Sequence, residues 1–344
     1  MIRILIAEGS ATVRRTLRDI FGAGSEVAIV GEAADGPSAI SMTSRLRPDV
    51  IVMDVDIPEM GGFNATKQIM TETPTPIVIL SAEHSERQAE VSMQALRAGA
   101  LTVLARPTDP ASAGDGEARQ RFIGTVVAMS QVKLVRHWPN REPGIRQRSP
   151  ANIAGSGPAK IIAIAASTGG PTAIQSVLSQ LPPEFPAPIL VVQHIASGFV
   201  GGFVNWLNTG CSLRVKVAEH EEPLAPRTVY VAPDEHHLGV RPGGVIQLSA
   251  APPIGGFRPS ATFLFESVAD VMGRGVLAIV LTGMGRDGIE GLQPVRTRGG
   301  RVLAQDEATS VVFGMPQAAI ATGCVDTVLP LPAIAPRILD LIQH

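Results

Sequence analysis

The chain has 344 residues, 45% of them hydrophobic and 17% charged, and its formal net charge at pH 7 is −2. This length suits about two domains, each large enough for its own hydrophobic core. The near-neutral charge lacks the basic surplus of nucleic-acid-binding proteins, and no apolar run is long enough to cross a bilayer. We therefore expect a globular protein with no nucleic-acid partner and no membrane insertion.

The N-terminus and the cysteines indicate the compartment. The first residues, MIRILIAEGS, lack the long apolar core and the small-residue cleavage site of a secretory signal. Cys211 and Cys324 are too few for the disulfide framework of a secreted domain. We expect a cytoplasmic protein.

Residues 1–107 alternate between short apolar runs typical of buried strands and amphipathic patterns typical of helices. The expected strands are Ile2–Ala7, Val27–Ala33, Val50–Asp54, Ile77–Ser81 and Leu101–Ala105. The expected helices lie near Ala11–Phe21, Pro37–Arg45, Gly62–Thr71 and Glu86–Ala98. Repeated units of this kind predict a doubly wound parallel sheet with any site at the carboxyl ends of its strands, where Asp54 is expected.

A linker is expected between two domains. A mixed apolar and polar pattern from Asp115 to about Val135 predicts one more helix of the first domain. The segment from Trp138 to Gly157 then combines prolines and arginines without any periodicity, which is typical of a linker. We therefore expect a first domain over 1–136, a linker over 137–158 and a second α/β domain over 159–344.

The second domain opens with an apolar run, Ile161–Ala166, that stops at Ser167 and is followed by Thr168, Gly169, Gly170 and Pro171. This pattern predicts a buried strand, a tight turn and a helix with proline at its first position. Ser167 would then face backbone N–H groups that can hold an anion or a developing oxyanion. The glycines would let a ligand approach the backbone closely. A nucleotide-binding loop, or a serine that only caps the helix, fits the same pattern.

Two further buried strands are predicted to end beside chemically capable side chains. Ile189–Gln193 ends at His194, and Val276–Leu281 is followed by a glycine-rich loop that contains Asp287. Parallel strands share one carboxyl edge, so both side chains can meet Ser167 there. Serine, histidine and aspartate are the set that nucleophilic acyl transfer requires, although each alone also has a purely structural explanation. The order Ser, His, Asp and the lack of G-x-S-x-G disfavour the α/β-hydrolases.

The segment MDVDIPEMGG around Asp54, together with Ser81 and Arg106-Pro107, resembles a response-regulator receiver domain of flavodoxin-like fold. The resemblance implies that Asp54 is the phosphoacceptor, in a pocket with Glu8, Ser81 and Arg106. Receivers bind Mg²⁺ through two adjacent carboxylates, but this chain has Glu8-Gly9, and Arg106 replaces a compact lysine by a planar fork. We therefore predict a degenerate receiver that is phosphorylated poorly or not at all, with only a weak Mg²⁺ site at Glu8 and Asp54.

Residues 159–344 resemble the catalytic domain of the chemotaxis protein-glutamate methylesterases (CheB family), enzymes that also deamidate receptor glutamines. The matching segments are AASTGGP at Ala165–Pro171, QHI at Gln193–Ile195, YVAP at Tyr230–Pro233, RPSA at Arg258–Ala261, LTGMGRDG at Leu281–Gly288 and AQDEATSVVFGMPQAA at Ala304–Ala319. The resemblance implies a Rossmann-like fold in which Ser167 is the nucleophile, His194 the general base and acid, and Asp287 the residue that orients it.

The same resemblance extends to the surroundings of these residues. Met284 would offer its backbone N–H near the oxyanion, and Thr168, Gly169 and Gly170 complete the predicted oxyanion and substrate group. Catalysis would need no metal or other cofactor. In the family the receiver covers the catalytic edge until phosphorylation relieves the block, so methyl-accepting chemoreceptors and a chemotaxis-type histidine kinase are the expected partners.

Other interpretations stay open. A nucleotide-binding module would use the turn at Ser167 for phosphate and would not need His194 or Asp287. A catalytically silent signalling scaffold would keep the fold without turnover. His236 and His237 are adjacent and would point to opposite faces of a strand, so they predict no metal pair, and we assign His237 no catalytic role.

Overall fold

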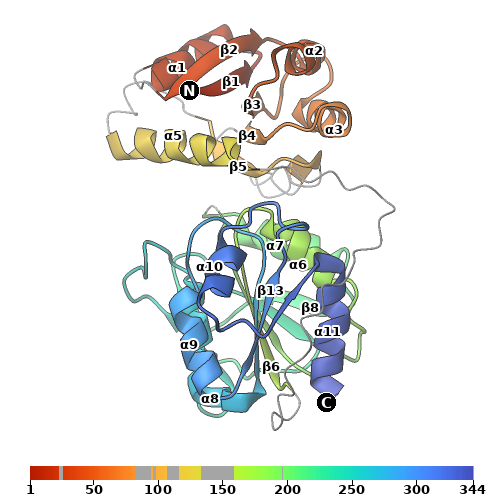
Figure 1. The fold of residues 1–344 in the computed structure, drawn as a ribbon, viewed down its shortest axis with the longest axis vertical. Coiled ribbons are helices and arrows are strands. Elements are labelled where there is room, and N and C mark those ends of the chain that lie inside the picture. The colour runs from red at the N-terminus through yellow and green to blue at the C-terminus, as the bar shows by residue number, and fades with distance from the viewer. Residues whose placement is uncertain are drawn as a thin grey trace. The chain divides into compact units, whose positions relative to one another are not determined.

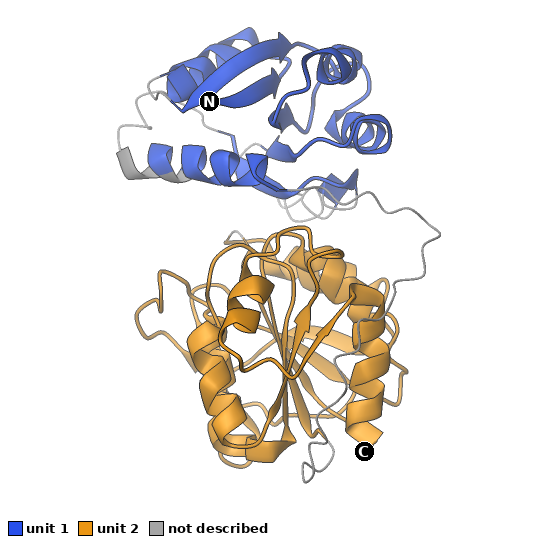
Figure 2. Ribbon diagram, viewed as in Figure 1, with its two compact units in different colours: residues 1–136 blue, residues 137–344 orange. Residues whose placement is uncertain are grey.

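The computed structural model describes residues 1–22, 26–81, 94–95, 98–106, 116–132, 159–195 and 197–343. The chain divides into two compact units, residues 1–136 and residues 137–344 (Figure 2). Most of the helix predicted near Glu86–Ala98, as well as Pro107 and the linker expected at 137–158, lies outside the described residues.

The first unit is built on a 5-stranded parallel sheet with strand order β2-β1-β3-β4-β5 (Figure 1). Its elements are β1 (Ile2–Ala7), α1 (Ala11–Gly22), β2 (Val27–Ala33), α2 (Gly36–Leu46), β3 (Val50–Asp54), α3 (Gly62–Glu72), β4 (Ile77–Ser81), β5 (Thr102–Ala105) and α5 (Gly116–Ser130). Every residue of β3 and β4 is buried, which explains their unbroken apolar sequences. The chain reverses its direction across the sheet between β1 and β3, so Glu8 and Asp54 lie at this switch point.

The second unit contains a 7-stranded parallel sheet in the order β14-β13-β12-β6-β7-β9-β8 and a separate antiparallel hairpin of β10 and β11. Its strands are β6 (Ile161–Ala166), β7 (Ile189–Gln193), β8 (Arg214–Val217), β9 (Thr228–Val231), β10 (His237–Arg241), β11 (Val245–Ser249), β12 (Val276–Val280), β13 (Arg301–Gln305) and β14 (Thr327–Leu329). Its helices are α6 (Gly170–Leu178), α7 (Val200–Asn208), α8 (Ala261–Met272), the short 3₁₀ helix Gly273–Gly275, α9 (Ile289–Thr297), α10 (Met315–Ala321) and α11 (Leu331–Gln343). The predicted α/β class with two doubly wound parallel sheets is confirmed.

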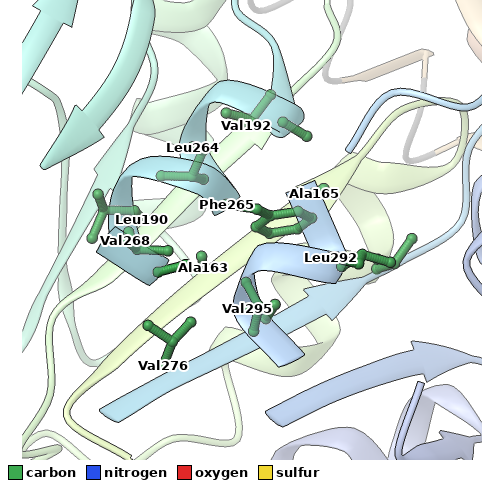
Figure 3. Close-up of a cluster of buried hydrophobic side chains, with 14 of the residues drawn as sticks. Ala163, Ala165, Leu190, Val192, Leu264, Phe265, Val268, Val276, Leu292 and Val295 are labelled. Carbon is green, nitrogen blue, oxygen red and sulfur yellow. The ribbon is translucent and has the colours of Figure 1, made fainter. Parts of the chain in front are cut away.

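Helices cover both faces of the second sheet, with α8 and α9 on one side and α6 and α11 on the other (Figure 1). Figure 3 shows Phe265 of α8 and Leu292 of α9 gathered with Ala163 and Ala165 of β6 in one buried cluster. The small alanines of the central strand leave room for these larger side chains, and burial of each contributes about 1.5–3 kcal/mol. Among the described residues, no helix has both the length and the apolar character needed to span a membrane.

The topology determines where a site can form. The chain runs from β6 to β7 on one side and later returns to β12 on the other side of β6. The carboxyl ends of these three neighbouring strands therefore share one edge at the switch point of the sheet. The hairpin of β10 and β11, which turns at Gly243-Gly244, lies outside this sheet.

Candidate active site

Ser167 and His194 leave the sheet side by side. Ala166 of β6 pairs with Gln193 of β7, so the next residue of each strand stands at the same level of the edge. The backbone N–H of His194 donates to the carbonyl of Ala166 at 3.0 Å, and the N–H of Ser167 donates to the carbonyl of Thr282 at 3.1 Å. Parallel pairing thus places the serine between the histidine and the loop that follows β12.

The imidazole of His194 is hydrogen-bonded to Asp287. Nε2 of His194 lies 2.8 Å from Oδ2 of Asp287, and both side chains are largely buried. Nδ1 of His194 is buried and has no hydrogen-bond partner among the described residues. Since Asp287 engages Nε2, Nδ1 is the nitrogen left to accept a proton. The structure brings His194 and Asp287 together as predicted, but among the described residues it records no hydrogen bond between the Ser167 hydroxyl and His194.

The carboxylate of Asp287 lies at the N-terminus of α8. Oδ2 also accepts from the N–H of Ala261 at 2.6 Å, and Oδ1 accepts from the Ser260 hydroxyl at 2.6 Å and from the N–H of Gly288 at 2.9 Å. Burial alone would raise the pKa of Asp287, but the hydrogen bonds from His194, Ser260 and Ala261 outweigh it and hold this pKa below its ordinary value. Asp287 is therefore ionised at neutral pH and can stabilise a positive charge on His194.

The lowered pKa of Asp287 predicts a pH-dependent contribution to stability. Because this pKa lies below its ordinary value of 3.8, ionised Asp287 stabilises the folded state fully above that value, and the contribution is lost as the pH falls through the folded pKa. The difference in unfolding free energy between wild type and Asp287→Asn should be constant above about pH 5 and shrink below about pH 4. Urea unfolding across this range measures it; a difference that stays constant down to about pH 3 would contradict the assignment.

Glycine is required at two positions of the Ser167 turn, but not for the predicted approach of a ligand. Gly169 has a φ of 77°, and a Cβ atom there would lie 2.5 Å from Cβ of Val311. A Cβ atom at Gly170 would lie 2.0 Å from the side-chain oxygen of Gln193. Protein side chains, rather than a ligand, thus require glycine here. The N–H of Gly170 donates to the carbonyl of Ser167 at 2.8 Å, so in this structure it is engaged within the turn, and the place of Gly170 in the oxyanion and substrate group stays a prediction.

Two backbone donors flank Ser167. Among the described residues, the N–H groups of Thr168 and Met284 have no recorded hydrogen-bond acceptor. The Thr282 hydroxyl donates to the carbonyl of Thr168 at 2.9 Å and thereby ties the turn after β6 to the loop after β12. The side chain of Met284 is 43% exposed, so this loop faces solvent. The N–H of Gly169 likewise has no recorded acceptor among the described residues, so Thr168, Gly169 and Met284 stay the predicted donors for an oxyanion at Ser167.

Sequence reasoning missed three residues that hold the site. The side-chain amide of Gln193 donates to the carbonyls of both Ser167 and His194, each at 2.8 Å, and so fixes the two strand ends to each other. The ring of Phe257 stacks on His194 with centroids 4.2 Å apart and planes 8° from parallel. Ser260 is the N-cap of α8, and the signals that could have found it were its position just before an apolar helical run and its place in the RPSA segment.

In the first unit, Arg106 neutralises the predicted phosphoacceptor pocket. Glu8 and Asp54 are both buried, and the guanidinium forms an ion pair with Asp54 and a longer one with Glu8, at 3.8 Å. Burial raises the pKa of both carboxyls, and the attraction of Arg106 offsets this only in part. Ser81 is buried at the end of β4, and its carbonyl accepts from the N–H of Arg106 at 2.7 Å.

The residues of this pocket do not fit Mg²⁺. A Cβ atom at Gly9 would lie 2.7 Å from the ring of Pro58, so a second carboxylate there would collide with the protein. Among the described residues, no three His, Cys, Asp or Glu side chains gather as metal ligands. Mg²⁺ requires near-octahedral oxygen ligation, whereas here a guanidinium pairs with the available carboxylates. The weak Mg²⁺ site expected at Glu8 and Asp54 is therefore not supported.

The sequence model of the CheB methylesterase family matches residues 162–338, and that of the response regulator receiver domain matches residues 4–113. Protein-glutamate methylesterase/protein-glutamine glutaminase 4 of Myxococcus xanthus (strain DK1622) is 48% identical over 98% of this chain and 96% of the relative. The protein numbered 3 of the same name from Anaeromyxobacter dehalogenans (strain 2CP-C) is 46% identical over 98% of both chains. The crystal structure of the Thermotoga maritima CheB methylesterase catalytic domain superposes with a TM-score of 0.52 and 39% identity, covering 53% of this chain and 98% of that one.

Proposed function

Because this chain belongs to the CheB methylesterase family and carries a response regulator receiver domain, we propose that it hydrolyses glutamate γ-methyl esters on chemoreceptors and deamidates receptor glutamines. The observation that carries the proposal is the hydrogen bond between His194 and Asp287 at the strand edge that also holds Ser167. This arrangement suits acyl transfer, and the activity serves chemotactic adaptation.

The first step forms an acyl-enzyme. Nδ1 of His194 takes the proton of the Ser167 hydroxyl while Oγ attacks the γ-carbonyl of the methylated glutamate. The N–H groups of Thr168 and Met284 donate to the resulting oxyanion, and Asp287 stabilises the imidazolium. The imidazolium then protonates the methoxy oxygen, the bond between this oxygen and the acyl carbon breaks, and methanol leaves.

The second step restores the enzyme. Nδ1 of His194 removes a proton from water, which attacks the acyl carbonyl, and the collapse of the second tetrahedral intermediate returns the proton to Ser167. The product is a glutamate carboxylate. When the substrate is glutamine, the same route expels ammonia in place of methanol, so one site serves both reactions.

An assay on the full chain tests this function. Purified protein should release methanol from a receptor segment carrying a glutamyl methyl ester, and ammonia from the same segment carrying glutamine. Hydrolysis in H₂¹⁸O should place one ¹⁸O atom in the product carboxylate, and a fluorophosphonate should label Ser167. Absence of methanol release from a methylated receptor segment, with no labelling of Ser167, would overturn the proposal.

A nucleotide-binding module is the alternative that uses the same turn. The contacts of Gly169 with Val311 and of Gly170 with Gln193 disfavour it, because side chains fill the space beside the glycines where a phosphate would lie. A nucleoside triphosphate that binds the folded state should raise the melting temperature. We expect no such shift with ATP or GTP at millimolar concentration.

The receiver should accept a phosphoryl group poorly. With acetyl phosphate and Mg²⁺, we expect labelling of the full chain well below one phosphoryl group per molecule, because Arg106 neutralises Asp54 and Gly9 provides no second carboxylate. Arg106→Lys should label more strongly, since a compact ammonium leaves a carboxylate oxygen free. Stoichiometric labelling of wild type that Asp54→Asn abolishes would contradict this prediction. If the receiver is labelled in that way, a histidine kinase is the partner that regulates turnover through it. If it is not, another signal sets turnover.

A further inference from the structure

A second histidine, His237, is buried behind Asp287. It begins β10, and its side chain is fully inaccessible to solvent. Nδ1 of His237 accepts a hydrogen bond from the N–H of Ser260 at 3.1 Å, and Nε2 lies 3.1 Å from the carbonyl of Pro252. A carbonyl only accepts, so Nε2 carries the proton and Nδ1 is the acceptor. The ring also stacks on Phe263, with centroids 5.0 Å apart. Both nitrogens are thus satisfied in one tautomer.

Ser260 connects this histidine to the carboxylate of the candidate active site. Its backbone is extended, with φ −113° and ψ 134°, and as the N-cap of α8 its N–H has no partner within the helix. His237 supplies that partner. The Ser260 hydroxyl donates to Oδ1 of Asp287 at 2.6 Å and accepts from the N–H of Thr262 at 3.2 Å. One residue therefore joins the two side chains through a backbone bond on one side and a hydroxyl bond on the other.

We propose that His237 is a positioning residue for the reaction, acting through Ser260 to hold Asp287 in the orientation that His194 requires; this rests on the proposed function. The series of hydrogen bonds runs from Pro252 through His237 and Ser260 to Asp287. Asp287 is fixed by donors of α8, and the entry of α8 is fixed by the imidazole of His237. Loss of that acceptor frees the N-cap residue to shift, and the shift moves Asp287 relative to Nε2 of His194.

Two substitutions at His237 each retain the hydrogen-bonding role of one ring nitrogen. The side-chain oxygen of His237→Asn can stand where Nδ1 stands and accept from Ser260, while the side-chain amide of His237→Gln can stand where Nε2 stands and donate to Pro252. We expect His237→Asn to keep kcat within a few-fold of wild type and His237→Gln to lower kcat about 10- to 100-fold with little change in KM.

A double-mutant cycle that combines His237→Gln with Ser260→Ala separates positioning from general destabilisation. Ser260→Ala keeps the backbone bond to His237 but removes the hydroxyl bond to Asp287. If the two residues act in series, the double variant should be no slower than the slower single variant. Thermal unfolding of every variant sets a common assay temperature at which all are folded. Should either His237 variant fail to fold, the kcat and KM of Ser260→Ala carry the test, with a loss in kcat expected and a change in KM alone contradicting the role.

Certain outcomes overturn the positioning role. Three results would each show that His237 only stabilises the fold: equal losses of kcat in His237→Asn and His237→Gln, losses of kcat that multiply in the double variant, or a change in KM rather than kcat in His237→Gln. Failure of the proposed function has a different signature, because wild type and the His237 variants alike would then release no methanol from a methylated receptor segment.

Discussion

Replacement of Ser167 by alanine is expected to lower kcat for methyl ester hydrolysis by about 10⁴-fold or more, with the protein still folded. The proposed mechanism gives Ser167 the only covalent role, so removal of its hydroxyl leaves no nucleophile for the first step. Methanol release under saturating substrate measures the effect. Glutamine deamidation should fall by the same factor, because both reactions pass through the same acyl-enzyme.

The matched control is Ser179→Ala, which removes a serine hydroxyl just after α6, whereas Ser167 lies before that helix. Ser179 is the C-cap of α6, is exposed, and bonds only weakly to the carbonyl of Ser176, at 3.4 Å. Its replacement should leave kcat within about twofold of wild type and stability within about 0.5 kcal/mol. Retention of more than about a tenth of the wild-type rate in Ser167→Ala would remove the serine from the mechanism.

The strands that carry the site could be predicted because they are short, uninterrupted apolar runs. Ile161–Ala166 and Ile189–Gln193 have the predicted bounds, and the run expected at Val276–Leu281 ends one residue earlier, at Val280. Parallel pairing then places the residues after these strands at one edge, however far apart they are in sequence. The positions of Ser167 and His194 therefore follow from strand periodicity and topology alone.

The supporting contacts could not be predicted, because their partners depend on how distant segments pack. Ser260 meets Asp287 across 27 positions, and the Gln193 amide reaches two carbonyls on neighbouring strands. A serine before an apolar helical run predicts an N-cap, but nothing local indicates that its hydroxyl also bonds the carboxylate of Asp287. The same limit applies at Gly170, where the sequence does not show that the side chain of Gln193 fills the space beside the backbone.

In the receiver pocket too, the residue types could be predicted from the sequence, whereas the packing around them could not. The absence of a second carboxylate beside Glu8 could be read directly from the sequence, as could the exchange of lysine for Arg106. The collision of any side chain at Gly9 with Pro58 could not, because it depends on how the loop after β3 lies over the end of β1. Restoring the second acidic residue alone therefore should not restore a metal site, since Pro58 occupies the space it would need.

Asp287→Asn is expected to lower kcat by about 10⁴-fold, although it replaces an oxygen by a nitrogen of nearly the same size. Among the described residues, every polar neighbour recorded for this carboxylate is a donor: His194 and Ala261 at Oδ2, and Ser260, Thr262 and Gly288 at Oδ1. An amide nitrogen must therefore face at least one donor. If it faces His194, Nε2 becomes an acceptor and the ring proton moves to Nδ1, the atom that has to accept the proton of Ser167. The base is then blocked, and no negative charge remains to stabilise the imidazolium.

The control for this loss is Asp326→Asn, which alters another largely buried carboxylate away from the site. Asp326 precedes β14, accepts from the N–H of Val302 at 2.7 Å and pairs with Arg296 at 2.6 Å. Both variants should lose about 1–3 kcal/mol of stability, since each weakens a buried hydrogen-bonded acceptor. Only Asp287→Asn should lose turnover when the two are assayed at a temperature where both are folded. Equal kcat values in the two variants would mean that Asp287 serves α8 alone, and that His194 is oriented by the stacking of Phe257 and the strand backbone.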